Sequence, residues 1–272
     1  MYLISVTIAM ATVPRPLSPP RWGDDDERKR QMEFLNKYVA VTGASGGIGR
    51  PLSEHLAGLG LTVFGLDLVT DPNPPPGVRS LPVDLTVASS VDEAVASVYE
   101  LTSGPVDLVC CAGIVENDVP AEEMSAEQFD AVIAVNLRGV FLSCRGFGRE
   151  LLERGGGSIV NVASISGNYI VNRPQRQCAY NASKAAVTAL TKCLAVEWAT
   201  RGVRVNVISP GYVDTPLLSL KPHQWEQWKS EIVLGRFAEP VEMARAVAFL
   251  LSTESSYCCG TELVVDGGYS LR

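Results

Sequence analysis

The segment 42–49, which reads TGASGGIG, constrains the fold of this chain more than any other stretch. It follows a short apolar run at 38–41 and precedes a helical pattern in which apolar residues recur at three- and four-residue spacing from Ile48 to Leu59. Glycines at a strand-to-helix turn allow a tight bend and let the backbone approach a pyrophosphate, whose negative charge the helix N-terminus stabilises. An ordinary turn explains one or two glycines but not this pattern, so we expect a dinucleotide-binding unit.

Strands and helices alternate along the rest of the chain. Short apolar runs, each typical of a strand that is buried on both faces, lie at 61–66, 78–83, 106–110, 158–162, 203–207 and 263–265. The longest helical segment covers 125–152, and a proline-rich loop at 71–77 stands in place of a long second helix. Buried strands separated by helices predict a parallel sheet that is covered on both sides. The predicted fold class is therefore α/β, a single-domain, Rossmann-like doubly wound sheet.

The first residues differ in composition from this domain. Residues 11–33 are rich in Pro, Arg and Asp, which favours extended or mobile chain, so we expect an N-terminal extension at 1–33 and the dinucleotide-binding domain at 34–272. The apolar residues 1–10 follow no basic region and form no apolar run of about 18 residues. Neither a signal peptide nor a membrane span is expected, and the cytoplasm is the default location.

The net charge and the cysteine pattern argue against several classes of function. A formal charge of −7 disfavours a nucleic-acid binder, which needs a basic face to displace phosphate counterions. The seven cysteines show no C-x-x-C spacing and the chain has only two histidines, so we expect neither a disulfide framework nor a metal site. We expect reduced cysteines that act as small buried hydrophobic residues. The expected partners are a small molecule and further copies of this chain, with no nucleic acid and no membrane.

A tyrosine and a lysine four residues apart form a second chemical signature. Tyr180 and Lys184 lie in the segment YNASK, and side chains at this spacing project from the same face of a helix. The pair alone is weak evidence, but Ser164 lies upstream at the end of an apolar strand and Asn136 lies in the preceding helix. Because these elements occur together, a helix with a merely surface-exposed Tyr and Lys is a poor explanation.

The chain resembles the classical short-chain dehydrogenase/reductase family over residues 37 to about 271. The motifs that carry this resemblance are TGASGGIG at 42–49, Asp84-Leu85, Ala112-Gly113, NLRG at 136–139, Ser164, YNASK at 180–184 and PGYVDT at 210–215. One departure is Cys110-Cys111, which stands where the family usually has Asn-Asn and which removes no catalytic group. The resemblance implies an NAD(P)-dependent oxidoreductase that acts on CH–OH groups.

The resemblance also implies the roles of individual residues. Tyr180 would transfer the proton, Ser164 would hydrogen-bond the substrate oxygen, and Asn136 would anchor a water that links Lys184 to solvent. Since free tyrosine has a pKa near ~10, Lys184 would lower the pKa of Tyr180 and would also hold the nicotinamide ribose. The residues expected at the cofactor are Gly43, Ser45, Gly47, Ile48, Gly49, Asp67, Asp84, Leu85, Ala112, Gly113, Asn136, Tyr180, Lys184, Pro210, Gly211, Val213 and Thr215.

Two serines compete for the contact with the substrate oxygen. Ser164 precedes Tyr180 by 16 positions and Ser166 by 14, and both spacings are longer than the family's commonest one. We favour Ser164, because the strand that ends at 162 fixes its place and the extra residues fit into the following loop. Ser166 remains the alternative. The residues expected at the substrate are Ser164, Ser166, Asn172 and Tyr180.

The segments 164–175 and 263–269 resemble the polyol and ketose branch of the family, the mannitol, xylitol, galactitol and sorbose type dehydrogenases. A polyol or ketose is therefore the expected substrate. A bulkier cyclic or steroid-like ketone, or a biosynthetic intermediate, is the alternative. A non-catalytic, dinucleotide-binding regulatory protein is a further alternative, but such proteins usually lack the tyrosine or the lysine that this chain keeps.

Asp67 favours NAD(H) over NADP(H). It ends the second predicted strand and follows Gly49 by 18 positions, close to the ~20 expected for an acidic residue that accepts hydrogen bonds from the adenosine ribose. A carboxylate there repels a 2′-phosphate, and Arg50 is the only nearby cation. An aspartate that merely caps the strand end is the alternative.

The resemblance further implies a homotetramer in which the helices at 125–152 and 178–200 form one interface. An exposed-looking apolar stretch around Val264 and Tyr269 adds modest support. A symmetric dimer is the alternative.

Overall fold

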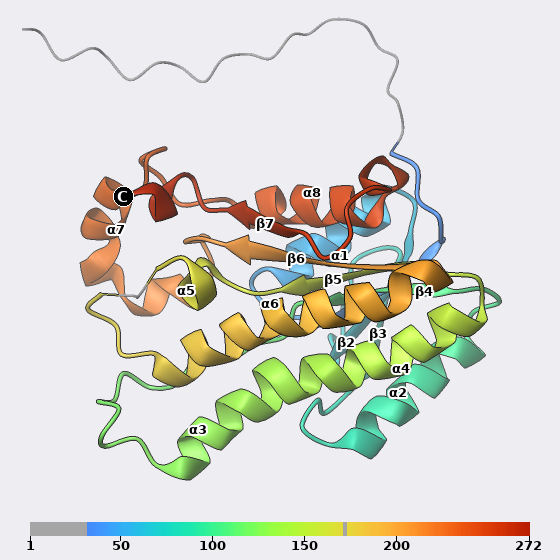
Figure 1. The fold of residues 1–272 in the computed structure, drawn as a ribbon, viewed down its shortest axis with the longest axis horizontal. Helices are drawn as coiled ribbons and strands as arrows, with labels where there is room; N and C mark the ends of the chain where they lie inside the picture. Colours follow the sequence, from blue (N-terminus) through green and yellow to red (C-terminus); the bar gives the residue numbers. More distant parts are fainter. Residues whose placement is uncertain (1–31, 171–172) are drawn as a thin grey trace, which may run out of the picture. The chain divides into compact units, whose positions relative to one another are not determined.

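The computed structural model describes residues 32–170 and 173–272, and its core is one seven-stranded sheet in which every strand pair is parallel (Figure 1). The strand order is β3-β2-β1-β4-β5-β6-β7. The strands are β1 (Tyr38–Thr42), β2 (Thr62–Asp67), β3 (Val78–Pro82), β4 (Val106–Cys110), β5 (Gly157–Val162), β6 (Val203–Pro210) and β7 (Glu262–Val265). The predicted doubly wound α/β fold is confirmed. The predicted extension at 1–33 lies outside the described residues except for Met32 and Glu33, so that boundary stays a prediction.

Helices cover both faces of the sheet (Figure 1). On one face, α1 (Gly49–Gly58) packs against α8 (Pro240–Leu251), and on the other α2 (Ala88–Glu100), α4 (Val140–Glu153) and α6 (Cys178–Trp198) lie side by side. The remaining helices are α3 (Ala126–Ile133), α5 (Ile165–Asn168), α7 (Trp225–Glu231), the π-helical η1 (Ala134–Gly139), and the 3-10 helices η2 (Ala199–Arg201), η3 (Leu218–Leu220), η4 (Pro222–Gln224), η5 (Thr253–Ser255) and η6 (Tyr269–Leu271).

Alternation along the strands divides the core into two layers. Val39 and Val41 of β1 pack with the α1 and α8 side chains, whereas Ala40 between them faces the layer that contains Phe64 and Phe147. All five side chains are almost fully buried, and each large one contributes roughly 2 kcal/mol through its removal from water. Because helices cover both faces, a ligand site is expected at the carboxyl ends of the strands and not on a face of the sheet.

The long helix predicted at 125–152 is present, but a π-helical turn interrupts it at η1. Its start is fixed by a capping box, in which the Ser125 hydroxyl accepts from the Gln128 backbone N–H and the Gln128 side chain accepts from the Ser125 backbone N–H. Ala126–Glu153 is also long and apolar enough to cross a membrane by length and composition, but 50% of its apolar window is buried inside the protein. That burial is typical of a helix packed on the core of a globular domain.

The cysteines are all free, but they are not all buried. Cys110 and Cys144 lie in the core with their sulfur atoms 4.0 Å apart, as expected of small hydrophobic residues. Cys178, Cys193 and Cys259 are exposed. The expectation of buried cysteines is therefore wrong for these three, because exposure on a helix or loop cannot be inferred from residue type alone.

Candidate active site

Most of the predicted catalytic residues meet at the carboxyl ends of the central strands. The order of the sheet reverses between β1 and β4, and the crevice at such a point is where parallel α/β sheets bind ligands. A cavity of about 630 Å³ lies there. Of the predicted site residues, its lining includes Ile48, Gly113, Ser164, Ser166, Tyr180, Lys184, Pro210, Gly211, Val213 and Thr215.

The glycine-rich turn forms a cradle that side chains would fill. Gly43 has a φ of +68°, and a Cβ atom there would lie 2.6 Å from the Ala112 Cα, so only glycine fits. A Cβ atom on Gly47 would lie 2.7 Å from the Cβ of Thr215, which packs the turn against the segment after β6. A Cβ atom on Gly49 would collide with the Gly43 carbonyl. This open backbone at the start of α1 fits the pyrophosphate of a dinucleotide.

Asp67 ties the end of β2 to this turn. Its carboxylate accepts the backbone N–H of Ser45 at 2.9 Å and that of Leu68 at 2.8 Å. Arg50 is the nearby cation that could pair with the 2′-phosphate of NADP(H). In the structure it donates to the Asp71 carboxylate instead. Both acceptor contacts leave carboxylate lone pairs free, so Asp67 can still accept hydrogen bonds from a ligand.

Asp84 and Leu85 lie after β3, outside the cavity lining. The Asp84 carboxylate accepts the backbone N–H and the hydroxyl of Thr86 at 2.8 and 2.6 Å, and these bonds lower the pKa of Asp84. Leu85 packs against Gly139, where a Cβ atom would lie 2.9 Å from the Leu85 Cβ. The predicted cofactor residues that do not line the cavity are Gly43, Ser45, Gly47, Gly49, Asp67, Asp84, Leu85, Ala112 and Asn136.

Tyr180 and Lys184 project from the first turns of α6 towards the end of β5. The Lys184 Nζ donates to the Val162 carbonyl at 2.8 Å and lies 5.7 Å from the centre of the Tyr180 ring. The Ser164 hydroxyl caps α5 by accepting the Ser166 backbone N–H at 3.2 Å, and it also hydrogen-bonds the Tyr180 phenol. Both serines line the cavity, but this last contact supports Ser164 as the partner of the substrate oxygen.

The pKa of Tyr180 differs from the expectation. Burial raises it, the hydrogen bond with Ser164 lowers it, and the charge of Glu116 raises it further, with a net shift above the ordinary value. Burial lowers the pKa of Lys184 to about 8, although the interactions with Cys111 and Cys110 act to raise it. The expected lowering of the Tyr180 pKa is thus not seen: burial is the largest cause of the shift, and Lys184 is not among its causes. The protein groups keep Tyr180 protonated at neutral pH.

Asn136 braces the loop after β4 against α6. Its fully buried amide accepts the Ile114 backbone N–H at 2.8 Å and donates to the Ile114 carbonyl at 2.8 Å and to the Ser183 hydroxyl at 3.1 Å. Ser183 donates in turn to the Tyr180 carbonyl at 2.7 Å. The π-helical turn η1, a feature frequent at functional sites, carries this side chain. Its role as a water anchor stays a prediction.

The two cysteines that replace the usual asparagines have different surroundings. Cys110 is in the core, whereas Cys111 lines the cavity beside Lys184. Burial raises the pKa of Cys111 to about 11, so its thiol is neutral near pH 7 and adds no charge to the site. Asn172, the remaining predicted substrate residue, lies outside the described residues.

Further residues complete the cavity, and the sequence analysis did not predict them as site residues. Among them are Glu116, Asn117, Asp118, Gln175, Gln177, Tyr212, Leu217, Leu218, Leu220, Lys221 and Trp228. Tyr212 stacks on Trp228 with ring centres 4.5 Å apart, which adds an aromatic surface to a lining that also contains polar side chains. Tyr212 could have been found from its place inside PGYVDT, but the loop residues carry no periodic or motif signal.

Comparisons with known proteins agree with this geometry. A family model described as Enoyl-(Acyl carrier protein) reductase matches residues 43–270. Galactitol 2-dehydrogenase (L-tagatose-forming) of Cereibacter sphaeroides is 38% identical over 243 residues, which cover 86% of this chain and 94% of that protein. D-threitol dehydrogenase of Mycolicibacterium smegmatis is 36% identical over 250 residues, 87% of this chain and 94% of that protein. The crystal structure of a short-chain type dehydrogenase/reductase from Mycobacterium marinum matches with a TM-score of 0.83 at 33% identity, covering 88% of this chain and 98% of that one.

Proposed function

Since the chain belongs to the short-chain dehydrogenase/reductase family, whose members are oxidoreductases that use a nicotinamide dinucleotide, we propose that it interconverts a polyol and a ketose with NAD(H). The meeting of Ser164, Tyr180 and Lys184 in one cavity carries this proposal. A non-catalytic, dinucleotide-binding regulatory protein is the weaker alternative, because such a protein does not need all three of these catalytic side chains.

In the proposed reaction, Tyr180 moves the proton at the substrate oxygen while Ser164 holds that oxygen by a hydrogen bond. A bound nicotinamide would accept the hydride from the carbinol carbon during oxidation or supply it to the carbonyl carbon during reduction. With its raised pKa, the phenol of Tyr180 is neutral at neutral pH and holds the proton that a ketone takes up when it is reduced. Lys184, with a pKa of about 8, is mainly protonated at neutral pH and would hold the ribose hydroxyls.

A polyol is favoured by the polar part of the cavity lining and by the two relatives named for galactitol and D-threitol. Asn117, Asp118, Gln175 and Gln177 offer hydrogen-bonding groups there. The apolar part of the lining supports the second candidate, a bulkier cyclic or steroid-like ketone, because it includes the stacked rings of Tyr212 and Trp228 and several leucines. A panel of polyols, ketoses, cyclic alcohols and steroids, followed by the absorbance of reduced nicotinamide, distinguishes them. Turnover confined to steroids would overturn the polyol assignment.

The preference for NAD(H) rests on Asp67 at the end of β2. Its carboxylate lies beside the glycine-rich turn, where it would accept hydrogen bonds from the adenosine ribose and would repel a 2′-phosphate. Arg50 points to Asp71 and so is already paired.

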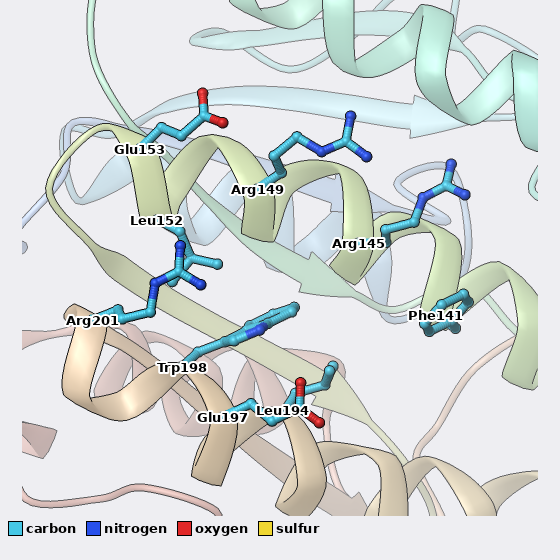
Figure 2. A pocket seen from close by; sticks show the side chains of 9 residues that line it. All are labelled: Phe141, Arg145, Arg149, Leu152, Glu153, Leu194, Glu197, Trp198 and Arg201. Atoms are coloured by element: carbon cyan, nitrogen blue, oxygen red, sulfur yellow. The ribbon is translucent and has the colours of Figure 1, made fainter.

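We also propose a homotetramer in the cytoplasm, with α4 and α6 at one interface. A hollow of about 330 Å³ lies between these helices (Figure 2). The α4–α6 hollow is lined by Phe141, Arg145, Arg149, Leu152, Glu153, Leu194, Glu197, Trp198 and Arg201. Apolar side chains between arginines and glutamates suit a two-fold interface, since an arginine of one copy can meet a glutamate of the next.

A further inference from the structure

Helix α6 has no N-terminal cap of its own. Its N-cap residue, Gln177, forms no side-chain cap hydrogen bond, and its first turn contains no acidic residue. The Glu116 carboxylate instead accepts the Ala179 backbone N–H at 2.9 Å and the Tyr180 backbone N–H at 3.2 and 3.1 Å, one distance to each oxygen. A carboxylate in this place accepts hydrogen bonds from two backbone N–H groups that have no partner within the helix. Its negative charge also interacts favourably with the positive end of the helix dipole. We propose that Glu116 is a positioning residue that holds the turn carrying Tyr180 and sets the charge beside its phenol.

The loop that carries Glu116 is itself held in place. Asn136 bonds both backbone groups of Ile114 at 2.8 Å, two residues before Glu116. Two residues after it, Asp118 accepts the Arg176 backbone N–H at 2.9 Å, just before α6 begins. The cap is therefore attached to the sheet through the loop after β4, so the place of the Tyr180 backbone depends on a residue 64 positions earlier.

The same carboxylate also acts on the chemistry of the phenol. The groups that face Tyr180 are Ser164 after β5, Lys184 on α6 and Glu116 after β4. The negative charge of Glu116 raises the pKa of Tyr180 and thereby opposes Ser164. Glu116 thus favours the protonated phenol, which is the form that donates a proton to a ketone. This inference rests on the proposed acid–base role of Tyr180.

Two substitutions separate the cap from the charge. Glu116→Gln keeps an oxygen that can accept from the helix but removes the charge, so the pH profile of kcat/KM for alcohol oxidation should move to lower pH with kcat nearly retained. Glu116→Ala removes both the hydrogen-bond acceptor and the charge. Because the turn that carries Tyr180 is then held less firmly, kcat should fall on the order of 10-fold while the KM for the cofactor changes little. Hydrogen exchange at the Ala179 and Tyr180 amides should accelerate in Glu116→Ala far more than in Glu116→Gln. The control is Glu122→Gln, an exposed acid of the same loop, which should change none of these.

Several results would overturn the proposal. An unshifted pH profile in Glu116→Gln would show that the charge does not act on Tyr180. Unchanged amide exchange and unchanged kcat in Glu116→Ala would show that the cap does not hold the turn. If Glu116→Ala does not fold, the exchange and pH profile of Glu116→Gln still decide the matter. Full turnover in Tyr180→Phe would instead refute the proposed function, and the exchange measurement would then test the cap by itself.

Discussion

The Lys184 ammonium donates a 2.8 Å hydrogen bond to the carbonyl of Val162, the last residue of β5. This bond holds a cation inside the protein, where only 3% of the residue is exposed. Desolvation lowers the pKa of the lysine to about 8, so its charge reduces stability at neutral pH. The site therefore keeps a destabilising group, which is typical of a residue retained for chemistry rather than for packing.

Lys184→Met should stabilise the fold while abolishing turnover. The folded pKa of about 8 lies below the ordinary value of 10.5, so unfolding takes up a proton between these two pH values. The penalty is fully present below pH 8 and disappears as the pH rises towards 10.5. After subtraction of the lost hydrogen bond to Val162, the variant should gain about 2 kcal/mol at pH 7. Denaturant unfolding of both proteins across this pH range measures the gain, and a gain that does not shrink with rising pH would contradict the account.

The two serines should differ in their effect on catalysis. Ser164→Ala should lower kcat/KM by roughly 10²-fold or more, since it removes the hydrogen bond at the reacting oxygen, and it should cost about 1 kcal/mol through loss of the α5 cap. Ser166→Ala is the matched control, because this residue lines the same cavity but offers α5 only its backbone N–H. Steady-state kinetics decide between them. A larger loss in Ser166→Ala would reverse the assignment.

Asp67→Ala should relax the choice of cofactor. Without the carboxylate, the repulsion of a 2′-phosphate and the hydrogen bonds to the ribose are both lost, so kcat/KM should fall with NAD(H) and rise with NADP(H). Asp71→Ala is a useful comparison, since it removes one carboxylate partner of Arg50 and leaves Asp67 in place. A wild-type preference for NADP(H), or an unchanged preference in Asp67→Ala, would refute the assignment.

The α4–α6 hollow should be covered by a second copy of the chain. Phe141 is 43% exposed at its edge, so Phe141→Glu should place a charge in the apolar part of the interface and reduce the mass seen by light scattering. Tyr257→Glu is the control, because Tyr257 is fully exposed in a loop away from this hollow. A wild-type protein that is already monomeric would contradict the proposed tetramer.

The residues that could be predicted from sequence are those whose chemistry needs a local pattern. Gly43 is required by its positive φ and its contact with Ala112, and Tyr180 and Lys184 share a helix face through their four-residue spacing. The start of helix α8 also has a local sequence pattern that predicts it, a capping box of Glu239 and Glu242 with a proline at the first helical position.

Other features depend on contacts between distant parts of the chain. Glu116 caps α6 by accepting from residues 63 and 64 positions later in the sequence, and no local sequence pattern predicts such a contact. Tyr212, which follows β6, and Trp228, on α7, meet only in the folded chain. The raised pKa of Tyr180 could not be predicted for the same reason, because its largest cause is burial, which is a property of the folded chain.

The proton-transfer role of Tyr180 is the central claim, and Tyr180→Phe tests it most directly. The substitution removes the phenolic oxygen and keeps the ring, so packing in the cavity is preserved. Turnover of the best polyol with NAD⁺ should fall by at least ~10²-fold, while NADH binding, measured by fluorescence titration, should be unchanged. Turnover near the wild-type rate, with NADH still bound, would contradict the account.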